Sequence, residues 1–520
     1  MFQSKMIFLR IILFLSLVLF SNVTCYNILV IFPHITYSHY NLGLTLSKGL
    51  AEKGHNVTLV APFKEPKQKI NNLRTIYIFE NSKYPYAGAY EKRLSHGKSS
   101  QEHVEILERS NNITKATLEN KDVQDLLKSK EHFDLMVFDF ILNDAFLGVA
   151  NTFNVPAIAF SSVGENPLLN HLTGVPLLPS FVPHITSIYS SKMTFLQRVH
   201  NFLSNLVTYI LIETLYTPTQ EQLYNKHFPD PKPSLIDLRR NISLVISNSH
   251  PLLRFASPQM PNFIEVGGLH LKKNKITKIP SALNKFIEDA TYGVIYFSLG
   301  STKGADPIVL PDDKIKSLLE GFKRVPQRVL FKCDLQIKNF AVPDNVFVSN
   351  WFPQESVIAH PNVKLYITHG GKGGLYEAIF YAVPIIGIPL GCDNHQGITK
   401  LVHEGFGVEI DLDILTANLL ESSINEVLVN NTYQEKANLI SKAFRHHVAD
   451  PLELAVHWVE HVIKHKSLFY MQTNAMSLSV VQYFSLDSIF LLFIVSALLI
   501  YGVFDMLQTH LNKNVKTKSY

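Results

Sequence analysis

Short apolar runs alternate with segments of helical periodicity along most of the chain. NILVIFP at 27–33 is the first such run, and after it Leu42, Leu46 and Leu50 fall on one face of a helix. Similar runs follow at 54–62, 133–139, 155–162, 244–249, 263–271, 293–301, 328–333, 345–353, 364–371 and 384–390. Fully apolar strands that alternate with helices are typical of parallel sheets covered on both faces. The pattern therefore predicts an α/β protein with two doubly wound domains.

Two stretches interrupt this alternation. Residues 165–235 are rich in Leu, Pro, Phe and Tyr without clean periodicity, and we expect loops and short helices that line an apolar pocket. KKNKITKIP at 272–280 is basic and ends in proline, which is typical of a linker. We therefore predict a first domain at 26–270, a linker at 271–288 and a second domain at 289–450. Helices at 451–487 are expected to return toward the first domain and a membrane.

Both ends of the chain are hydrophobic. Lys5 and Arg10 precede a ten-residue apolar run and the small residues SNVTC, which predicts a signal peptide at 1–25. A spanning helix is the alternative, but the run is short for one. Residues 488–504 contain no charge and are bounded by Asp487 and Asp505, which predicts a transmembrane helix rather than a buried core helix. Residues 505–520 would then form a short tail.

Composition excludes several classes of protein. The net charge of +5 is small and its basic residues are scattered, so no nucleic-acid partner is expected. Cleavage after Cys25 would leave Cys333 and Cys392, too few for a disulfide framework or a zinc cluster. Sequons at Asn112, Asn241 and Asn430 could carry glycans in a secretory compartment. The sequon at 56–58 lies in a predicted buried strand and is a poorer candidate.

Four of the 24 glycines lie at 370–374, between an apolar strand and a helix. Such a turn lets the backbone approach a ligand, and the helix N-terminus offers free N–H groups to a phosphate. A dinucleotide fingerprint would need glycine where Tyr376 stands, and a P-loop would need Ser or Thr where Gly373 stands. The glycines therefore indicate either a different anion-binding loop or a tight turn without a ligand.

Residues 350–396, NWFPQESVIAHPNVKLYITHGGKGGLYEAIFYAVPIIGIPLGCDNHQ, resemble the signature of the UDP-glycosyltransferases of the membrane-bound animal type. The segments GHNVTLV, EVGGLHL and FSLGS and both hydrophobic ends match in the same order. The resemblance thus covers essentially the whole chain. It implies the GT-B fold, in which two Rossmann-like domains face one another across a cleft, followed by a single C-terminal transmembrane helix.

The resemblance also implies where the nucleotide sugar binds. Its site would be made of Ser301, Trp351, Gln354, His369, Gly371, Gly373, Glu377, Asp393 and Asn394. The indole of Trp351 would stack on uracil, Gln354 would bond the nucleoside and Glu377 would grip the ribose hydroxyls. His369 and the glycines would hold the diphosphate opposite Ser301, and Asp393 and Asn394 would reach the sugar. Two positions depart from the family pattern. Gly373 replaces an asparagine common in vertebrate members, and Asn394 replaces a glutamine. Lys372 is interpreted as a solvated loop residue.

The first domain would supply the catalytic groups. Ser38 is expected to cap a helix, and His39 matches the general base of the family. His34 is the rival histidine, nearer the strand end. Asp139, at the end of the strand FDLMVFD, matches the carboxylate that orients the base, and Asp144 is the second candidate.

No metal and no cofactor are expected. The Asp-x-Asp at 411–413 follows GFGVEI and precedes an amphipathic helix, so a strand end and a helix cap explain it.

The resemblance implies inverting transfer of a hexose from a UDP-sugar to a small lipophilic acceptor, giving a β-glycoside. UDP-glucose is the expected donor because the pattern looks invertebrate, and UDP-glucuronate is second. A non-catalytic nucleotide-sugar-binding protein and a single-pass receptor are the alternatives, and a homo-oligomer stays open. The tail KTKSY resembles a dilysine retrieval signal, which indicates the endoplasmic reticulum membrane with the catalytic domains in the lumen.

Overall fold

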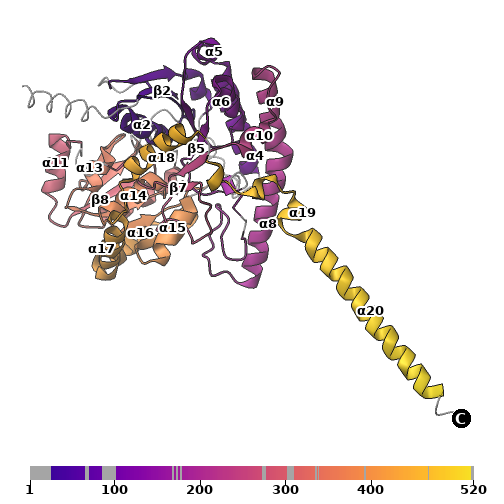
Figure 1. Cartoon of the computed structure of the whole chain (residues 1–520). Coiled ribbons are helices and arrows are strands. Elements are labelled where there is room, and N and C mark those ends of the chain that lie inside the picture. The colour runs from indigo at the N-terminus through magenta and orange to yellow at the C-terminus, as the bar shows by residue number, and fades with distance from the viewer. Residues whose placement is uncertain are drawn as a thin grey trace, which may run out of the picture. The chain divides into compact units, whose positions relative to one another are not determined.

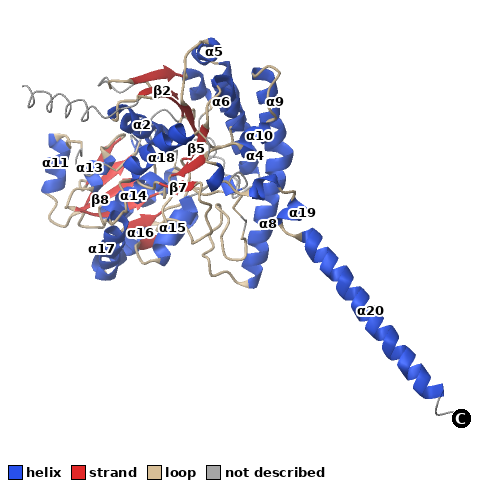
Figure 2. Ribbon diagram, in the orientation of Figure 1, coloured by secondary structure: helices blue, strands red, loops and turns tan. Residues whose placement is uncertain are grey.

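The computed structural model describes residues 25–64, 70–84, 101–166, 169–170, 174–175, 178–271, 277–300, 310–333, 337, 339–391, 394–466 and 468–516. The chain divides into two compact units, Met1–Gln472 and Thr473–Tyr520. The first unit contains two parallel β-sheets with helices packed on their faces (Figures 1 and 2). The predicted pair of doubly wound α/β domains is therefore confirmed.

The first sheet has the strand order β3-β2-β1-β4-β5-β6-β7 within the described residues, and its neighbours pair in parallel. Its strands are β1 (Asn27–Ile31), β2 (Asn56–Ala61), β3 (Leu73–Tyr77), β4 (Leu135–Asp139), β5 (Ala157–Ser161), β6 (Leu244–Ser247) and β7 (Phe263–Glu265). Strands β4 and β5 are buried along their whole length, as their apolar sequences predict. Strand β3 was not predicted, because it is an edge strand without the continuous apolar run of a buried one.

Helices cover both faces of this sheet, and Leu42, Leu46 and Leu50 of α2 are buried against it as predicted. The helical elements are α2 (Tyr37–Glu52), η1 (Phe79–Lys83), α4 (Gln101–Glu119), α5 (Lys121–Lys128), η2 (Asp144–Phe146), α6 (Leu147–Phe153), α8 (Phe195–Leu211), η3 (Ile212–Tyr216), α9 (Thr217–His227) and α10 (Leu235–Arg240). Elements α8, η3 and α9 run on without a break, η3 being a single π-helical turn. The expectation of loops and short helices is therefore wrong for residues 195–227.

The second sheet has the order β10-β9-β8-β11-β12-β13 among the described residues, again with parallel neighbours. Its strands are β8 (Val294–Ser298), β9 (Arg328–Lys332), β10 (Val346–Ser349), β11 (Val363–Thr368), β12 (Ile385–Gly387) and β13 (Gly407–Glu409). Its helical elements are α11 (Ser281–Glu288), α12 (Asp312–Lys323), α13 (Gln354–Ile358), α14 (Lys372–Phe380), α15 (Asn394–His403), η5 (Leu412–Ile414), α16 (Ala417–Val429) and α17 (Asn431–Arg445). Helix α11 falls within the predicted linker, and its Leu283 and Ile287 are buried in the core of this sheet.

Helix α18 (Pro451–His465) carries the chain back to the first domain. The side chain of Asp450 caps its N-terminus by accepting bonds from the N–H groups of Leu452 and Glu453. Val456 and Val459 then lie in the same buried cluster as strand β1 and helix α2. The last part of the first unit thus stabilises the domain in which the chain begins.

The second unit contains η7 (Asn474–Ser477), α19 (Val480–Tyr483) and α20 (Leu486–Lys516), while η6 (Phe469–Met471) ends the first unit. Among the described residues, α20 is the one helix long and apolar enough to cross a membrane, over Leu486–Asn512. This stretch includes the predicted span at 488–504. The predicted signal peptide lies, except for its last residue, outside the described residues.

Candidate active site

The strand order reverses once in each sheet, between β1 and β4 in the first and between β8 and β11 in the second. Open parallel sheets bind ligands outside the carboxyl ends of their strands at such a switch point. Two contacts bring the two switch points together. The ring of Tyr37 meets the ring of Trp351 edge-on, with 5.7 Å between centroids, and Nζ of Lys372 donates to the carbonyl of Val163. Residues from both domains therefore border one site.

His39 and Asp139 meet at the first switch point. His39 lies in the first turn of α2, which begins at Tyr37 and has Thr36 as its N-cap, so the expected capping role of Ser38 is wrong. Asp139 is the fully buried last residue of β4, and its Oδ2 lies 2.9 Å from Nδ1 of His39. An ionised carboxylate can only accept a hydrogen bond, so Nδ1 carries the proton and Nε2 has the free lone pair.

Two further side chains hold Asp139 in place. The buried hydroxyl of Ser162 donates to its Oδ1 at 2.7 Å, and Nδ2 of Asn143 donates to its main-chain carbonyl at 2.7 Å. The sequence analysis missed Ser162. One signal was available, because Ser162 follows the end of β5, which pairs with β4 in the sheet.

The two alternative residues have other surroundings. His34 is fully buried behind His39, with 5.7 Å between ring centroids, and this burial lowers its pKa to about 4. Asp144 is also buried, and it accepts hydrogen bonds from Arg239 and Tyr216. The structure thus places Asp139, and not Asp144, against His39.

The glycine-rich loop forms the second switch point. Strand β11 ends at Thr368, Gly370 has a φ of +90°, and Gly371 is the N-cap of α14. The ring of His369 packs so tightly between two glycines that a Cβ would come within 3.1 Å of it at Gly300 and 2.7 Å at Gly371. Burial, together with the charge of Lys332, lowers the pKa of His369 to about 4. The loop thus presents a neutral imidazole beside the N–H groups of a helix N-terminus.

Two other positions of this loop differ in what surrounds them. A Cβ at Gly373 would meet only ring atoms of His270, at 3.8 Å, so a side chain could be accommodated there. Lys372 is buried and bonded to the first domain, which contradicts its interpretation as a solvated residue. Its partner is a backbone carbonyl more than 200 residues away, and no local pattern could indicate it.

Gln354 and Glu377 face each other beside this loop. Nε2 of Gln354 donates to Oε2 of Glu377 at 2.6 Å, and the hydroxyl of Tyr296 donates to Oε1 of Gln354 at 3.2 Å. Burial raises the pKa of Glu377 to about 8, and the bond from Gln354 opposes this shift. His270 of the first domain approaches Glu377 with 3.9 Å between Nε2 and Oε1. The sequence analysis assigned no role to His270, although its segment EVGGLHL was noted.

The remaining predicted site residues differ in their surroundings. Trp351 is 39% exposed, so it is not a core aromatic, and Nζ of Lys332 lies 5.3 Å from its ring centroid. Asn394 is the buried first residue of α15, and its Oδ1 makes no hydrogen bond to the described residues. Ser301 and Asp393 lie outside the described residues.

Comparison with known proteins identifies the family. A family model described as "UDP-glucoronosyl and UDP-glucosyl transferase" matches residues 29–520. The chain belongs to the UDP-glycosyltransferase family. It is similar to UDP-glycosyltransferase UGT5 of Dactylopius coccus, with 33% identity over 94% of each chain. UDP-glucosyltransferase 2 of the same organism is 33% identical over 93% of this chain and 92% of its own. UDP-glucuronosyltransferase 2B1 of Rattus norvegicus is 28% identical over 87% of this chain and 88% of its own.

Solved structures support the fold of this UDP-glycosyltransferase. The glycotransferase of kitacinnamycin superposes with a TM-score of 0.57 at 16% identity, covering 84% of this chain and 99% of its own. Glycosyltransferase VinC, solved in complex with DTDP, gives a TM-score of 0.55 at 16% identity, covering 84% and 100%. The predicted GT-B architecture is therefore confirmed. The chain is a transferase of the glucosyl- and glucuronosyl-transferring family.

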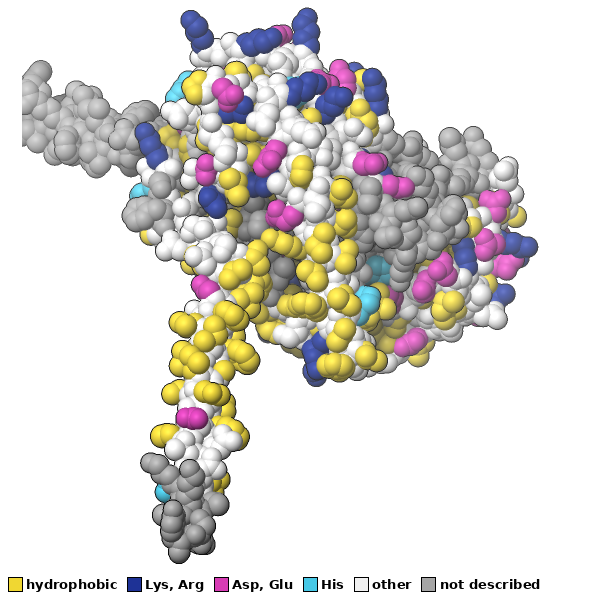
Figure 3. Space-filling model, turned by 90° about the vertical axis from the view of Figure 1, so that its right-hand side faces the viewer, with side chains coloured by type: hydrophobic (Ala, Val, Ile, Leu, Met, Phe, Trp, Pro, Cys, Tyr) yellow, Lys and Arg dark blue, Asp and Glu magenta, His cyan; other side chains and the backbone are white. Residues whose placement is uncertain are grey.

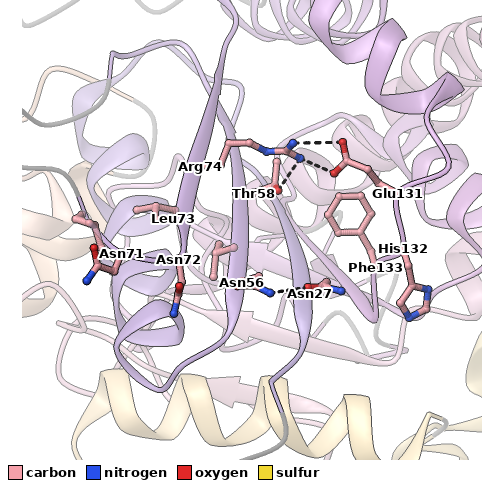
Figure 4. Close-up of a pocket in the computed structure, with 12 residues that line it drawn as sticks. Asn27, Asn56, Thr58, Asn71, Asn72, Leu73, Arg74, Glu131, His132 and Phe133 are labelled. Atoms are coloured by element: carbon pink, nitrogen blue, oxygen red, sulfur yellow. Dashed lines mark hydrogen bonds and ion pairs between the residues drawn. The ribbon is translucent and has the colours of Figure 1, made fainter.

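Two features of the UDP-glycosyltransferase lie away from this site. Asp411 accepts a hydrogen bond from the N–H of Asp413 at 3.0 Å and caps η5, the structural role expected for the Asp-x-Asp segment. An open pocket of about 800 Å³ lies at the amino-terminal ends of β1, β2 and β3 (Figure 4). Asn27 and Asn56 are bonded to each other in this pocket, and Asn56 is the exposed first residue of its strand rather than a buried one. The pocket is at the opposite edge of the sheet from Asp139.

Proposed function

We propose that this protein is an inverting UDP-glucosyltransferase that attaches glucose to a hydroxyl of a small lipophilic acceptor and forms a β-glucoside. The 2.9 Å contact between His39 and Asp139 carries the proposal. A binding protein without catalysis would have no use for a histidine oriented by a buried carboxylate at the point where the donor and acceptor domains meet. The lone pair on Nε2 of His39 suits it to accept a proton.

The proposed reaction is a single displacement. Nε2 of His39 takes the proton of the acceptor hydroxyl, and the oxygen of that hydroxyl attacks C1 of the sugar. The bond between C1 and the diphosphate oxygen breaks on the opposite face, and UDP leaves with the electron pair. The configuration at C1 is inverted, so an α-linked donor gives a β-linked product. The N–H groups at the start of α14 and the ring of His369 would stabilise the charge that develops on the diphosphate, and the proposal includes no metal.

The surroundings of four residues of the second domain support roles for them in binding the UDP-sugar. Glu377 and Gln354 would bind the ribose and the base, and the exposed indole of Trp351 would stack on uracil. The amide oxygen Oδ1 of Asn394, which makes no hydrogen bond to the described residues, would accept one from a sugar hydroxyl.

Glucose is the proposed sugar for two reasons. Asn394 is neutral, whereas the carboxylate of a glucuronate would favour a cationic partner. The curated relative UDP-glucosyltransferase 2 is also more similar to this chain than the mammalian UDP-glucuronosyltransferases quoted above, at 33% against 28% identity. UDP-glucuronate is the competing donor.

The test is a donor screen with the full-length protein. Microsomes that contain it are given UDP-glucose or UDP-glucuronate with a panel of phenols and steroids, and the products are identified by mass. We expect hexosides from UDP-glucose, and no products with a His39→Ala control. Hexuronides instead of hexosides would overturn the choice of donor, and equal yields from the control would overturn the mechanism.

We further propose that α20 anchors the enzyme in the endoplasmic reticulum membrane with its catalytic domains in the lumen. The apolar helix supports an anchor, and the lysines in KTKSY support retrieval to that compartment. In intact microsomes, residues 26–480 should resist added protease, and their digestion would refute the orientation. Exchange of Lys516 and Lys518 for serine should let the protein move on toward the cell surface.

A further inference from the structure

Helix α8 turns its polar residues inward. The buried Asn201 donates through Nδ2 to the carbonyls of Pro179 and Val182 at 2.8 and 2.9 Å, and its Oδ1 accepts from the N–H of His184 at 2.7 Å. One ring nitrogen of His184 then lies 3.0 Å from the hydroxyl of Thr208. The inner face of α8 is therefore a polar seam that holds the loop at 178–187, the reverse of what a surface helix of a soluble protein does.

The outer face of the same helix is apolar. Its side chains recur at intervals of one, three and four residues, which places them on one side, and each is between 41% and 76% exposed. They are Phe195, Leu196, Val199, Phe202, Leu203, Leu206, Val207 and Ile210. We call these eight residues the α8 face. Figure 3 looks onto the side of the molecule that carries α8, where hydrophobic side chains gather.

Such a face is unusual on a soluble surface. In the remaining described parts of the first unit, exposed large apolar residues are scattered, as at Tyr292 and Leu439. Scattered apolar residues need no explanation, but a continuous exposed patch marks a contact with a protein or a lipid.

The charges around the α8 face favour a lipid. The sequence has no Asp or Glu between Glu165 and Glu213, whereas Lys192 and Arg198 lie at the start of the helix. Glu213, three residues after Ile210, marks the end of this face, so basic residues lie at its start and no acidic residue lies along it. This is the pattern of a helix that lies in the interface of a bilayer. A protein partner would more often be selected by charges of both signs.

We propose that the α8 face lies in the interfacial region of the bilayer in which α20 is anchored. Thirteen residues separate Gln472 from Leu486, so the connection is at most about 45 Å long even when fully extended. A first unit tethered this closely meets the lipid surface continually, and burial of the α8 face there stabilises one orientation. The inference rests on the proposed anchor and is independent of the proposed donor and base.

The test maps lipid contacts on the full-length chain. The protein is reconstituted in vesicles of phosphatidylcholine and phosphatidylserine that contain a lipid with a photoactivatable acyl chain. After illumination, the adducts are located by mass spectrometry of peptides. We expect adducts at 195–210 in addition to those on α20, which serve as an internal control for insertion. Adducts confined to α20 would overturn the proposal.

Two variants sharpen the test. A double variant with Phe202→Glu and Leu206→Glu adds charge at exposed positions and should lower the adducts on α8 by about tenfold or more while those on α20 stay. Leu439→Glu, at an apolar residue of α17 that is 61% exposed, should change the adducts on neither helix. Unchanged α8 adducts in the double variant, or chain-to-chain cross-links at α8 in place of lipid adducts, would refute the lipid contact. UDP binding measured on the same samples distinguishes this failure from failure of the proposed function.

Discussion

Both Rossmann-like domains place functional residues where the strand order of their sheet reverses, but these residues are distributed differently along the sequence. In the second domain, most of the proposed donor site comes from one stretch, since Trp351, Gln354, His369 and Glu377 lie within 27 residues of one another. In the first domain, His39 and Asp139 are 100 residues apart, and Ser162 follows 23 residues later. The proposed donor site is therefore largely local in sequence, whereas the proposed catalytic pair forms only when parallel strands bring distant segments together.

The two domains also differ in how many hydrogen-bond partners their buried carboxyl groups have. Asp139 has a side-chain partner on each oxygen, at 2.9 Å from His39 and 2.7 Å from Ser162. Glu377 has one close partner, Gln354, and burial raises its pKa to about 8. Asp139 is thus held in a fixed position, whereas Glu377 still has capacity for the hydroxyl groups of a ligand.

Removal of the base should have the largest effect. His39→Ala should lower kcat by about 10³-fold, because a positioned general base contributes on that scale. UDP binding, measured by calorimetry, should stay near the wild-type value because the nucleotide site belongs to the other domain. His34→Ala is the matched control for a nearby buried histidine. If His39→Ala kept near-normal turnover and His34→Ala did not, the assignment of the base would be wrong.

The two aspartates should separate catalysis from stability. Asp139→Asn should lower kcat by about 10²-fold, since an amide favours the wrong tautomer of His39. Asp144→Asn breaks a buried pair with Arg239 and should instead cost about 3 to 5 kcal/mol of unfolding free energy. Steady-state kinetics measure kcat and denaturant unfolding measures the free energy of unfolding for both variants. The reverse order of kinetic effects would move the orienting role to Asp144.

Most strands could be predicted from the sequence because a parallel strand buried on both faces is a continuous apolar run. Strand β3 was not predicted because it lies at the sheet edge and has no continuous apolar run. Helix α8 was not predicted although its apolar residues recur at helical intervals, because they lie in a stretch that has no such periodicity as a whole. Site residues could be predicted where a motif is contiguous. Lys372 could not, because its partner is distant in sequence and lies in the other domain, and the signal for Ser162 was only its place after the strand that pairs with β4. The sequence favoured Asp139 over Asp144, and the contact of Asp139 with His39 and that of Asp144 with Arg239 decide between them.

Replacement of Glu377 should weaken donor binding and change the pH dependence of stability. Glu377→Gln should raise KM for the UDP-sugar by about tenfold, since an amide NH2 group replaces one of the two carboxyl oxygens that can accept hydrogen bonds from the ribose. Burial raises the pKa of Glu377 from 4.5 to about 8, so between these values the folded chain holds a proton that the unfolded chain has released. The wild-type protein should therefore lose stability relative to the variant as pH rises across that window.

Thermal unfolding of the wild-type and Glu377→Gln proteins at about pH 5 and about pH 8 measures this difference. Glu355→Gln is the matched control, because it removes a neighbouring carboxylate from α13. A stability difference between wild type and Glu377→Gln that stayed constant from the lower pH to the higher would contradict the raised pKa.

Replacement of Ser162, whose hydroxyl holds the second oxygen of Asp139, should also have a small effect, and on kcat alone. Ser162→Ala should lower kcat by about tenfold and leave KM for the UDP-sugar unchanged, because a hydrogen bond to a charged group is lost on the catalytic side alone. Ser162→Thr keeps the hydroxyl and should restore much of the rate. In the background of Asp139→Asn, Ser162→Ala should have little further effect, because the two residues act on the same histidine. A full additional tenfold loss of kcat in the double variant would show that Ser162 acts independently of Asp139. The first domain would then contain a second contact that contributes to catalysis.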